Sequence, residues 1–441
     1  MKKGVSFEVE SLGDTVIPNT VSTASYFKFH SDSERVLYHH LLSKFQDEVD
    51  EQGSPTGFEV AGPRKDIFFQ GEKCRAAILT CGGLCPGLNA VIRGVVLQLW
   101  YFYHCKQILG VRYGYNGLRH DSEEIVKLNP DWVRDIHSVG GTMLGTSRGA
   151  PPVEEMVDKL ETLKVDMLFI IGGDGSMRGG HAIWQEVRRR GLKLAVIGVP
   201  KTIDNDIPYV HRSFGYETAV KEAAKVVNAA HVESRGAPYG IGLVKLMGRY
   251  SGYITANAVL ASGNADFCLI PESPFELEGD NGLFALVKER LRRRRQVVIV
   301  VAEGAGQQFF RREELIKDAS GNIKPGDIGA YLRDRLNAHF SDVGFPVTLK
   351  YIDPSYIIRS TPPNFSDKIY CDHLARAAVH AAMAGKGGML IGNWHGHLTH
   401  VPMSALEGEV RQVDLQSDFW FSVLENTRQP YIIGPSVCAT D

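Results

Sequence analysis

The stretch VDMLFIIGGDGS, residues 165–176, decides the fold of this chain. It joins an apolar run to a Gly-rich turn, and residues that suit a helix follow the turn as far as Arg190. A run that is apolar at nearly every position indicates a strand buried on both faces, as in a parallel sheet covered by helices. The stretch therefore predicts a strand, a tight turn and a helix, which is the repeating unit of an α/β fold.

The same pattern recurs along the chain from Arg75 onward. A helix is expected over residues 88–100, and the other apolar runs that predict buried strands are 76–80, 192–199, 241–246, 297–302 and 389–391. The number of predicted strands is larger than one compact sheet of ordinary size contains. We therefore predict an α/β fold of two Rossmann-like three-layer α/β domains, with the active site in the cleft between them, plus an N-terminal extension.

Residues 1–72 differ from the rest of the chain because they are polar and poor in long apolar periods. One helix is expected over residues 33–48, where five apolar residues recur at helical spacing, namely Val36, Leu37, Leu41, Leu42 and Phe45. We interpret this segment as an extension that packs on the main body.

Composition narrows the class of protein. The 441 residues carry a formal net charge of −2, without the basic excess of a nucleic-acid-binding domain. No apolar run is long enough to predict a membrane span, and the N-terminus lacks the apolar run of a secretory signal. The seven cysteines are scattered, which favours free thiols. We expect a cytoplasmic protein that binds neither nucleic acid nor membrane.

Two Gly-rich loops are candidate phosphate sites. Residues 81–89, CGGLCPGLN, follow a predicted strand and precede a helix, so backbone N–H groups and the positive helix N-terminus can face an anion. Residues 140–149, GGTMLGTSRG, contain Arg148, which can hold a phosphate bidentately. A tight turn without a ligand and a surface arginine are the structural alternatives, and neither loop decides the matter alone.

Carboxylates stand in the turns after two predicted strands. Asp174, in the turn GGDGS at a helix start, is well placed to hold Mg²⁺ that bridges phosphate oxygens, with a helix N-cap as its structural alternative. In PKTIDND, residues 200–206, either Asp204 or Asp206 can accept a hydroxyl proton while the other supports it, and Lys201 adds a positive charge. An acidic turn with Asx capping is the alternative there.

Three short motifs later in the chain add further candidate site residues. They are KLMGR at 245–249, AEGAG at 302–306 and YIIR at 356–359. Together they supply two arginines and a carboxylate, which suit a sugar that bears hydroxyls and a phosphate. Each motif alone is equally consistent with a structural role.

In this order, GGLCPG, GTSRG, GGDGS, PKTIDND, MGR, AEG and YIIR resemble the motifs of the phosphofructokinase family over residues 70–400. The chain looks most like the ATP-dependent branch of the longer, pyrophosphate-kinase-related group of plants, protists and some bacteria. The resemblance implies a glycolytic kinase that uses Mg²⁺ and transfers the γ-phosphoryl group of ATP to the C1 hydroxyl of fructose 6-phosphate. Residues 73–215 and 358–405 would form the larger, nucleotide-binding domain. Residues 216–357 and 406–441 would form the smaller, sugar-phosphate-binding domain.

The family's roles transfer to this sequence motif by motif. Asp204 would be the general base, supported in catalysis by Thr202, Asp206 and Arg249, and Asp174 would hold Mg²⁺. The residues expected around the nucleotide are Gly82, Gly83, Ser147, Arg148, Gly173, Asp174, Gly175, Ser176 and Lys201. Those expected around fructose 6-phosphate are Thr202, Ile203, Asp204, Met247, Gly248, Arg249, Glu303, Lys350, Tyr356 and Arg359.

Two differences from the family pattern limit how far the family's residue roles can be assigned to this sequence. Gly240 stands where the shorter bacterial enzymes have an arginine that reaches into a neighbouring subunit, and Tyr356 stands where they have a histidine. Sugar-phosphate recognition is therefore expected to differ in detail. Lys350 falls where those enzymes place another cross-subunit arginine. The resemblance implies an allosteric homodimer or homotetramer, but its effectors cannot be carried over.

Two positions bear on the phosphoryl donor. Pyrophosphate enzymes of the family have a second aspartate after the Mg²⁺ aspartate, where this chain has Gly175. Without a side chain, the space for a nucleotide α-phosphate stays open and carries no repelling charge. Lys201 points the other way, because the pyrophosphate enzymes have lysine there. We give the steric and charge argument more weight and predict ATP.

Three alternatives stay open. They are a pyrophosphate-dependent fructose 6-phosphate phosphotransferase, a different GGDGS-type kinase that acts on a lipid or NAD, and an inactive regulatory subunit. The PKTIDND and MGR segments speak against the second alternative. The intact Asp174, Asp204 and Arg249 speak against the third.

Overall fold

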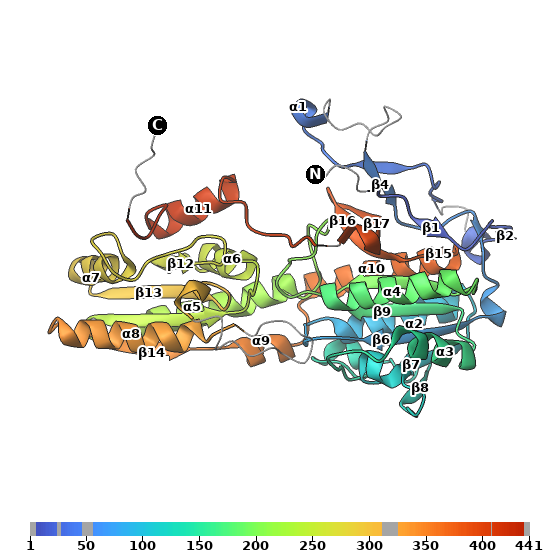
Figure 1. The fold of residues 1–441 in the computed structure, drawn as a ribbon, viewed down its shortest axis with the longest axis horizontal. Helices are drawn as coiled ribbons and strands as arrows, with labels where there is room; N and C mark the ends of the chain where they lie inside the picture. The colour runs from blue at the N-terminus through green and yellow to red at the C-terminus, as the bar shows by residue number, and fades with distance from the viewer. Residues whose placement is uncertain (1–5, 24–27, 46–55, 311–324, 407, 436–441) are drawn as a thin grey trace. The chain divides into compact units, whose positions relative to one another are not determined.

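The computed structural model describes residues 6–23, 28–45, 56–310, 325–406 and 408–435. The chain divides into two compact units. Unit 1 consists of Met1–Thr202, Ile207–Gly215 and Ser360–Glu409, and unit 2 of Ile203–Asp206, Tyr216–Arg359 and Val410–Asp441. Each unit contains a sheet with helices on both faces (Figure 1), so the predicted α/β class is confirmed.

Unit 1 is built on a nine-stranded sheet. Its strands lie in the order β3 (Arg35–Leu37), β4 (Gly57–Val60), β17 (His397–Pro402), β16 (Met389–Trp394), β10 (Ala195–Pro200), β9 (Met167–Gly172), β6 (Arg75–Thr80), β7 (Gln107–Val111) and β8 (Ile125–Leu128). The five strands from β16 to β7 run parallel, and the others join antiparallel. Every residue of β9 and β10 is buried, as expected for central parallel strands.

Four long helices cover this sheet. Helix α2 (Leu88–Phe102) packs against α10 (Phe365–Met383), and α3 (Val153–Thr162) packs against α4 (Asp174–Arg189). Helix α2 starts at Gly87, whose φ of +111° favours glycine. A Cβ atom there would lie 2.7 Å from the Cys371 sulfur of α10, so glycine also allows the two helices to approach.

Unit 2 is built on a four-stranded parallel sheet in the order β12 (Phe267–Leu269), β13 (Gln296–Ala302), β11 (Gly240–Leu246) and β14 (Thr348–Ile352). Helices α5 (Tyr216–Arg235) and α6 (Tyr253–Ser262) pack together on one face, where Gly242 approaches Ala230. Helices α7 (Leu283–Arg294) and α8 (Ile328–Asp342) share a core with the other face. The shorter α9 (Ser355–Ser360) and α11 (Asp418–Thr427) complete the unit.

The N-terminal segment extends unit 1 with short strands. Strand β1 (Glu10–Ser11) pairs with β15 (Lys386–Gly387), and β2 (Ile17–Pro18) pairs with β5 (Asp66–Ile67). Strands β3 and β4 join the edge of the large sheet through β17. The segment therefore packs on the main body as expected.

The helix expected over residues 33–48 is wrong in its first half. Residues 35–37 form β3, because the backbone of Gly57–Glu59 pairs with them. A Cβ at Gly57 would lie 2.6 Å from the Val36 carbonyl oxygen, so glycine permits this close pairing. The helix α1 covers only Leu42–Phe45, and residues 46–48 lie outside the described residues.

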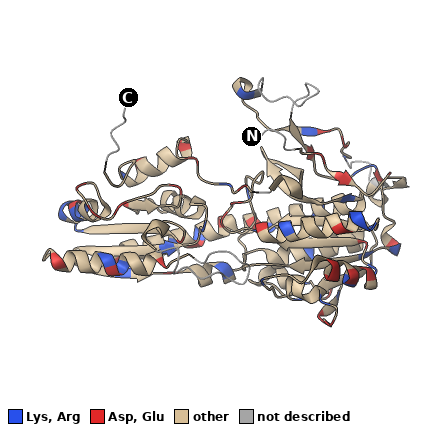
Figure 2. Cartoon of the chain, in the orientation of Figure 1, with Lys and Arg blue, Asp and Glu red and all other residues tan. Residues whose placement is uncertain are grey.

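Charged residues concentrate on helices and loops, whereas the central strands carry few (Figure 2). Among the described residues, no helix combines the length and the apolar character needed to cross a membrane.

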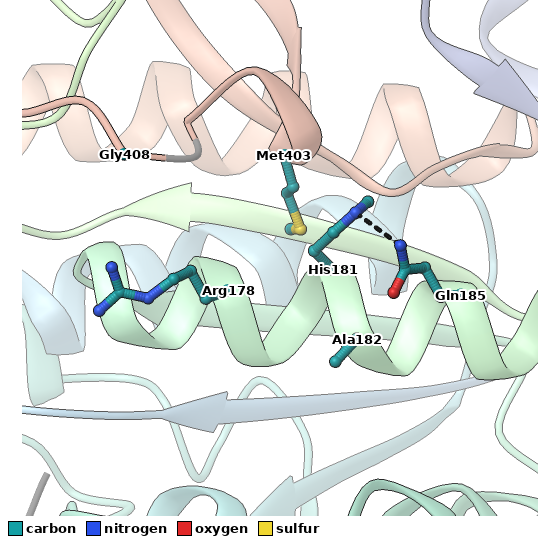
Figure 3. A pocket seen from close by; sticks show the side chains of 6 residues that line it. All are labelled: Arg178, His181, Ala182, Gln185, Met403 and Gly408. Carbon is teal, nitrogen blue, oxygen red and sulfur yellow. Dashed lines mark hydrogen bonds between the residues drawn. The ribbon is translucent and has the colours of Figure 1, made fainter. Parts of the chain in front are cut away.

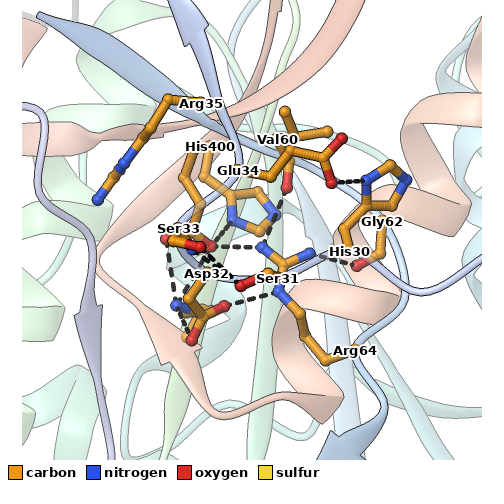
Figure 4. A network of polar contacts seen from close by, with 12 residues as sticks. His30, Ser31, Asp32, Ser33, Glu34, Arg35, Val60, Gly62, Arg64 and His400 are labelled. Atoms are coloured by element: carbon orange, nitrogen blue, oxygen red, sulfur yellow. Dashed lines mark hydrogen bonds and ion pairs between the residues drawn. The ribbon is translucent and has the colours of Figure 1, made fainter. Parts of the chain in front are cut away.

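One charged network inside unit 1 is an exception (Figure 4). The Glu59 carboxylate lies 2.6 Å from Nη2 of Arg64, 3.2 Å from Nζ of Lys386 and 2.8 Å from Nδ1 of His400. Asp32 of the N-terminal segment bridges the same two cations, at 2.7 Å from Arg64 and 3.1 Å from Lys386. Burial opposes ionisation of Glu59, but the hydrogen bond of His400 and the two cations outweigh it and lower the pKa of Glu59 to about 2.

We expect Glu59→Gln to lower the free energy of unfolding of unit 1 by about 3 kcal/mol at pH 7, because it leaves two buried cations with less compensation. Urea unfolding followed by circular dichroism measures the change. The matched control is Glu34→Gln, since Glu34 also pairs with a histidine, His30 at 2.7 Å, but its side chain is 40% exposed. Equal effects of both substitutions would contradict the role given to Glu59.

Candidate active site

The predicted site residues fall into two groups, one in each unit. We call the group in unit 1 the phosphate cluster; it consists of Gly82, Gly83, Ser147, Arg148, Gly173, Asp174, Gly175, Ser176, Lys201 and Thr202. We call the central part of the group in unit 2 the carboxylate cluster; it consists of Asp204, Asp206, Arg249, Glu303 and Arg359. The peptide bond between Thr202 and Ile203 leads from one group directly to the other.

Parallel pairing of β6, β9 and β10 assembles the phosphate cluster. Pro200 at the end of β10 pairs with Gly172 at the end of β9, and Thr80 at the end of β6 pairs with Ile171. The three turns that follow these strands therefore start at one edge of the sheet. Lys201 is buried, and its Nζ donates to the carbonyl oxygen of Gly83 at 2.8 Å, which ties the first turn to the third.

The GTSRG loop packs on the first turn. Oγ1 of Thr146 donates to the carbonyl oxygen of Gly82 at 2.7 Å, and Oγ of Ser147 donates to that of Tyr113 at 2.5 Å. Gly82 has a φ of +81°, which glycine adopts readily. Arg148, the loop's charged residue, is exposed.

The GGDGS turn begins helix α4, and the N-cap residue is Gly173. Asp174 is therefore the first residue of the helix, and the alternative in which it caps the helix does not hold. Its carboxylate is partly exposed and forms an ion pair with Arg178, at 2.7 Å from Nη1. Sequence reasoning missed Tyr115, whose hydroxyl supports the turn by donating to the carbonyl oxygen of Ser176 at 2.6 Å.

Gly175 leaves an open space at the start of α4. A Cβ atom there would have Arg178 Nη2 as its nearest neighbour, at 3.9 Å, which is ordinary van der Waals contact. Neither backbone conformation nor packing within the protein therefore requires glycine at this position. Gly83 is similar, since a Cβ there would meet nothing within 4 Å.

The donor atoms of the phosphate cluster suit Mg²⁺ that is held together with phosphates. This ion keeps several waters and usually takes only one or two protein carboxylates. Asp174 supplies one accessible carboxylate. The described residues hold no group of three or more His, Cys, Asp or Glu that would enclose a metal on its own.

A pocket of about 380 Å³ follows α4 beside this ion pair (Figure 3). Its lining residues are Arg178, His181, Ala182, Gln185, Met403 and Gly408. Positions 178, 181, 182 and 185 share one face of the helix with Asp174, because they recur at helical spacing. Arg178, the ion-pair partner of Asp174, is therefore the lining residue closest in sequence to the start of the helix.

The carboxylate cluster contains three acidic side chains and few compensating cations. Burial raises the pKa of Asp204 to about 8, and the negative charges of Asp206 and Glu303 act in the same direction. Arg359 and the backbone N–H of Arg249 oppose the shift without cancelling it. Oδ1 of Asp204 is shielded from solvent. A carboxyl group in these surroundings is a stronger base than an ordinary aspartate, because its protonated form is favoured.

The MGR and AEG turns fit into each other at the ends of β11 and β13. The N–H of Glu303 donates to the Leu246 carbonyl at 2.9 Å, and the N–H of Gly304 donates to that of Gly248 at 3.0 Å. A Cβ at Gly304 would lie 1.9 Å from the Arg249 carbonyl oxygen, so only glycine allows this contact. Nε of Arg359 reaches the sulfur of Met247 at 3.2 Å, which brings α9 to the same turns.

Two predicted residues lie elsewhere in unit 2. Lys350 is exposed on the edge strand β14, opposite Gly242, which is four residues before the end of β11. Tyr356 is 83% exposed on α9. Their proposed contacts with fructose 6-phosphate stay predictions.

Sequence reasoning also missed Arg411, which contacts the PKTIDND loop. Its backbone N–H donates to the carbonyl oxygen of Asp206 at 2.8 Å, and its Nη1 donates to that of Asn205 at 3.1 Å. Arg411 belongs to no Gly-rich turn and follows no apolar run, so the sequence offers no signal beyond its charge.

The protein has the features of an α/β enzyme that acts on phosphorylated ligands. Gly-rich turns follow its parallel strands, a carboxylate is accessible at the start of a helix, and a buried aspartate has a raised pKa. The sequence profile described as Phosphofructokinase matches residues 75–382, and the chain belongs to this family. The chain is 47% identical to a protein named "ATP-dependent 6-phosphofructokinase" from Amycolatopsis methanolica, with 92% of this chain and 89% of that protein covered. It is 44% identical to one of the same name from Borreliella burgdorferi, with 97% and 98% covered.

Solved structures show the same fold. The pyrophosphate-dependent phosphofructokinase from Marinobacter aquaeolei superposes with a TM-score of 0.66 at 20% identity, covering 82% of this chain and 92% of that one. Phosphofructokinase from Saccharomyces cerevisiae gives a TM-score of 0.62 at 22% identity, covering 80% of this chain and 47% of that one.

We expect Asp204 to titrate near pH 8, far above the ordinary aspartate range near 4. Carbon NMR of protein with ¹³C-labelled aspartate carboxyl groups measures the pKa of Asp204. The signal of Asp204 is the one that disappears in the Asp204→Asn variant. Asp206→Asn removes a negative neighbour, which favours the charged form, so the midpoint moves to lower pH. A midpoint of 4–5 in the unaltered protein would contradict the environment described for Asp204.

Proposed function

We propose that this protein is an ATP-dependent 6-phosphofructokinase, which phosphorylates fructose 6-phosphate at C1 in glycolysis. The observation that carries the proposal is the raised pKa of Asp204 between Asp206 and Glu303 in a chain of this family. Such a base suits an acceptor hydroxyl, because a general base works best when its pKa is near the operating pH. The two relatives described above carry this activity in their names.

The acceptor side of the reaction is assigned to unit 2. Asp204 takes the proton from the C1 hydroxyl as the phosphorus–oxygen bond forms. Burial, together with the negative charges of Asp206 and Glu303, keeps its pKa high enough to do so. Arg249 and Arg359 bind the sugar phosphate, since guanidinium groups match phosphate geometry. Most of the rate enhancement comes from positioning and charge stabilisation, as in phosphoryl transfer generally.

The donor side is assigned to unit 1. The glycine turns at 82–83 and 173–175 offer backbone N–H groups to the phosphates, and Lys201 adds a buried positive charge next to them. Asp174 would hold Mg²⁺, which would supply positive charge against the phosphate oxygens. The Asp174 carboxylate pairs with Arg178, which adds a further positive charge at the start of α4.

The space at Gly175 favours ATP over pyrophosphate. A Cβ atom at this position would have its nearest protein neighbour 3.9 Å away, so the glycine serves something outside the protein's own packing. Lys201 is the feature that fits either donor. We further expect the protein to act in the cytoplasm as an allosteric homodimer or homotetramer, as its family resemblance implies.

The test of the proposal is turnover of fructose 6-phosphate with Mg²⁺ and either ATP or pyrophosphate. We expect turnover with ATP, and we expect Gly175→Asp to lower kcat/KM for ATP by about 10²-fold, because like charges placed together cost several kcal/mol. Coupled-enzyme assays with the two donors measure both effects.

Gly175→Ala is the matched control, since it adds a Cβ in the same place without charge. Its loss for ATP is expected to be smaller than that of the aspartate variant. Wild-type turnover with pyrophosphate alone would make Lys201 the deciding residue. Lack of turnover with either donor would favour another kinase or a regulatory subunit.

Removal of the base gives a separate test. We expect Asp204→Asn to lower kcat by ~10²–10⁴-fold with a smaller change in KM, because the side-chain shape is kept and the proton acceptor is lost. Steady-state kinetics in both substrates measure the split. A near-normal kcat would remove Asp204 from the role of base.

A further inference from the structure

The loop that carries Asp204 is a short segment of unit 2 between two segments of unit 1. Residues 203–206 belong to unit 2, whereas the residues on either side, up to Thr202 and from Ile207, belong to unit 1. The loop's sequence neighbours therefore do not anchor it within unit 2. Whatever fixes it there comes from another part of the chain.

The backbone of this loop is in an unfavourable conformation. Asn205 has a φ of +56°, in the left-handed region, and its side chain is buried. Such a conformation costs roughly 1 kcal/mol even for residues that tolerate it, and it persists only where surrounding contacts hold it. The loop therefore needs partners to keep Asp204 in one orientation.

Residues 410–413 supply those partners, and we call them the strap. Arg411 binds two successive carbonyl groups of the loop, those of Asn205 through Nη1 at 3.1 Å and Asp206 through its backbone N–H at 2.8 Å. Its guanidinium lies over the Tyr253 ring, 4.4 Å from the centroid. A planar guanidinium held against a ring has little freedom, so the Asn205 carbonyl that it binds is held in a fixed position. The Asp206 carbonyl is held by the backbone N–H of Arg411.

The strap is itself fixed to the MGR end of unit 2. The Tyr253 hydroxyl donates to the Gln412 carbonyl at 2.8 Å, and the Gln412 side chain donates to the Tyr250 carbonyl at 3.0 Å. One oxygen of Glu272 accepts from the N–H of Val413 at 2.8 Å and from that of Gly252 at 2.9 Å. The strap thus joins the turn after Arg249 to the loop of Asp204.

We propose that Arg411 is a positioning residue for the carboxylate cluster, holding the 203–206 loop so that Asp204 faces the acceptor hydroxyl. Arg411 does not touch the reacting atoms; it acts through the carbonyls of Asn205 and Asp206. This inference rests on the proposed function for the role of Asp204. The geometry of the loop and strap does not depend on that function.

Unit 2 contains a closely matched control in Arg290. Its guanidinium also lies over an aromatic ring, that of Phe267 at 5.6 Å, and it also donates to two successive carbonyls, those of Thr427 and Arg428 at 3.1 and 2.6 Å. Arg290 is at the carboxyl-terminal part of α7, and its carbonyl partners are the last residue of α11 and the residue after it. Loss of Arg290 therefore removes a comparable ring contact and comparable carbonyl contacts, together with an ion pair to Asp266 at 3.1 Å, without affecting the 203–206 loop.

The experiment compares Arg411→Ala with Arg290→Ala in the full chain. We expect Arg411→Ala to lower kcat about 10²-fold, the usual cost of misplacing a reacting group by about 1 Å, with KM for ATP changed less than twofold. Millimolar guanidinium is expected to restore part of the kcat of Arg411→Ala and none in Arg290→Ala. A kcat of Arg411→Ala within twofold of wild type, or an equal loss in both variants, would overturn the proposal.

Hydrogen exchange on the ligand-free proteins separates this inference from the proposed function. We expect faster amide exchange in the peptide containing residues 203–206 for Arg411→Ala, and wild-type exchange there for Arg290→Ala. Unchanged exchange in Arg411→Ala would overturn the positioning role whatever the enzyme's activity. Absence of wild-type turnover with either donor would instead count against the proposed function, and it would be seen before any variant is compared.

Discussion

The parallel pairing of β9 with β10 is the constraint on which the phosphate cluster depends. Gly172 and Pro200 lie opposite each other, and the N–H of Lys201 donates to the Gly172 carbonyl at 2.8 Å just beyond the last pair. This bond fixes the GGDGS turn and the PKTIDND segment in one register. A slip by one residue would exchange the faces on which all side chains of β10 lie, and because both faces are closely packed, each side chain would meet different neighbours.

The pairing of β9 with β10 also fixes the end of β10, after which the chain leaves unit 1. Lys201 and Thr202 are buried at the end of β10, and the chain passes from unit 1 to unit 2 at Ile203. The carboxylates at 204 and 206 then follow within four residues. The phosphate cluster and the carboxylate cluster are therefore joined directly along the sequence.

The sequence was sufficient for the features that depend on local patterns. Apolar runs such as 167–171 and 297–302 identify their strands, because strands buried on both faces leave no polar positions. The Gly-rich turns after them identify most of the phosphate cluster. The expected helix at 33–48 failed because helical spacing of apolar residues does not exclude pairing with a distant strand, here β4. The contact between Arg411 and Asn205 could not be predicted from local patterns, because the two residues are 206 positions apart in the sequence.

Two buried carboxylates show how their surroundings separate a structural role from the catalytic role proposed for Asp204. Glu59 receives two cations and a histidine N–H, and the pKa falls to about 2 despite burial. Asp204 is placed beside two further carboxylates with less compensation, and the pKa rises to about 8. The first arrangement favours the ion and stabilises the fold around it, whereas the second destabilises the ion and leaves a base that accepts protons near neutral pH. Arg411 holds the loop of this destabilised group through the backbone carbonyls of Asn205 and Asp206, and not through the Asp204 carboxyl group itself.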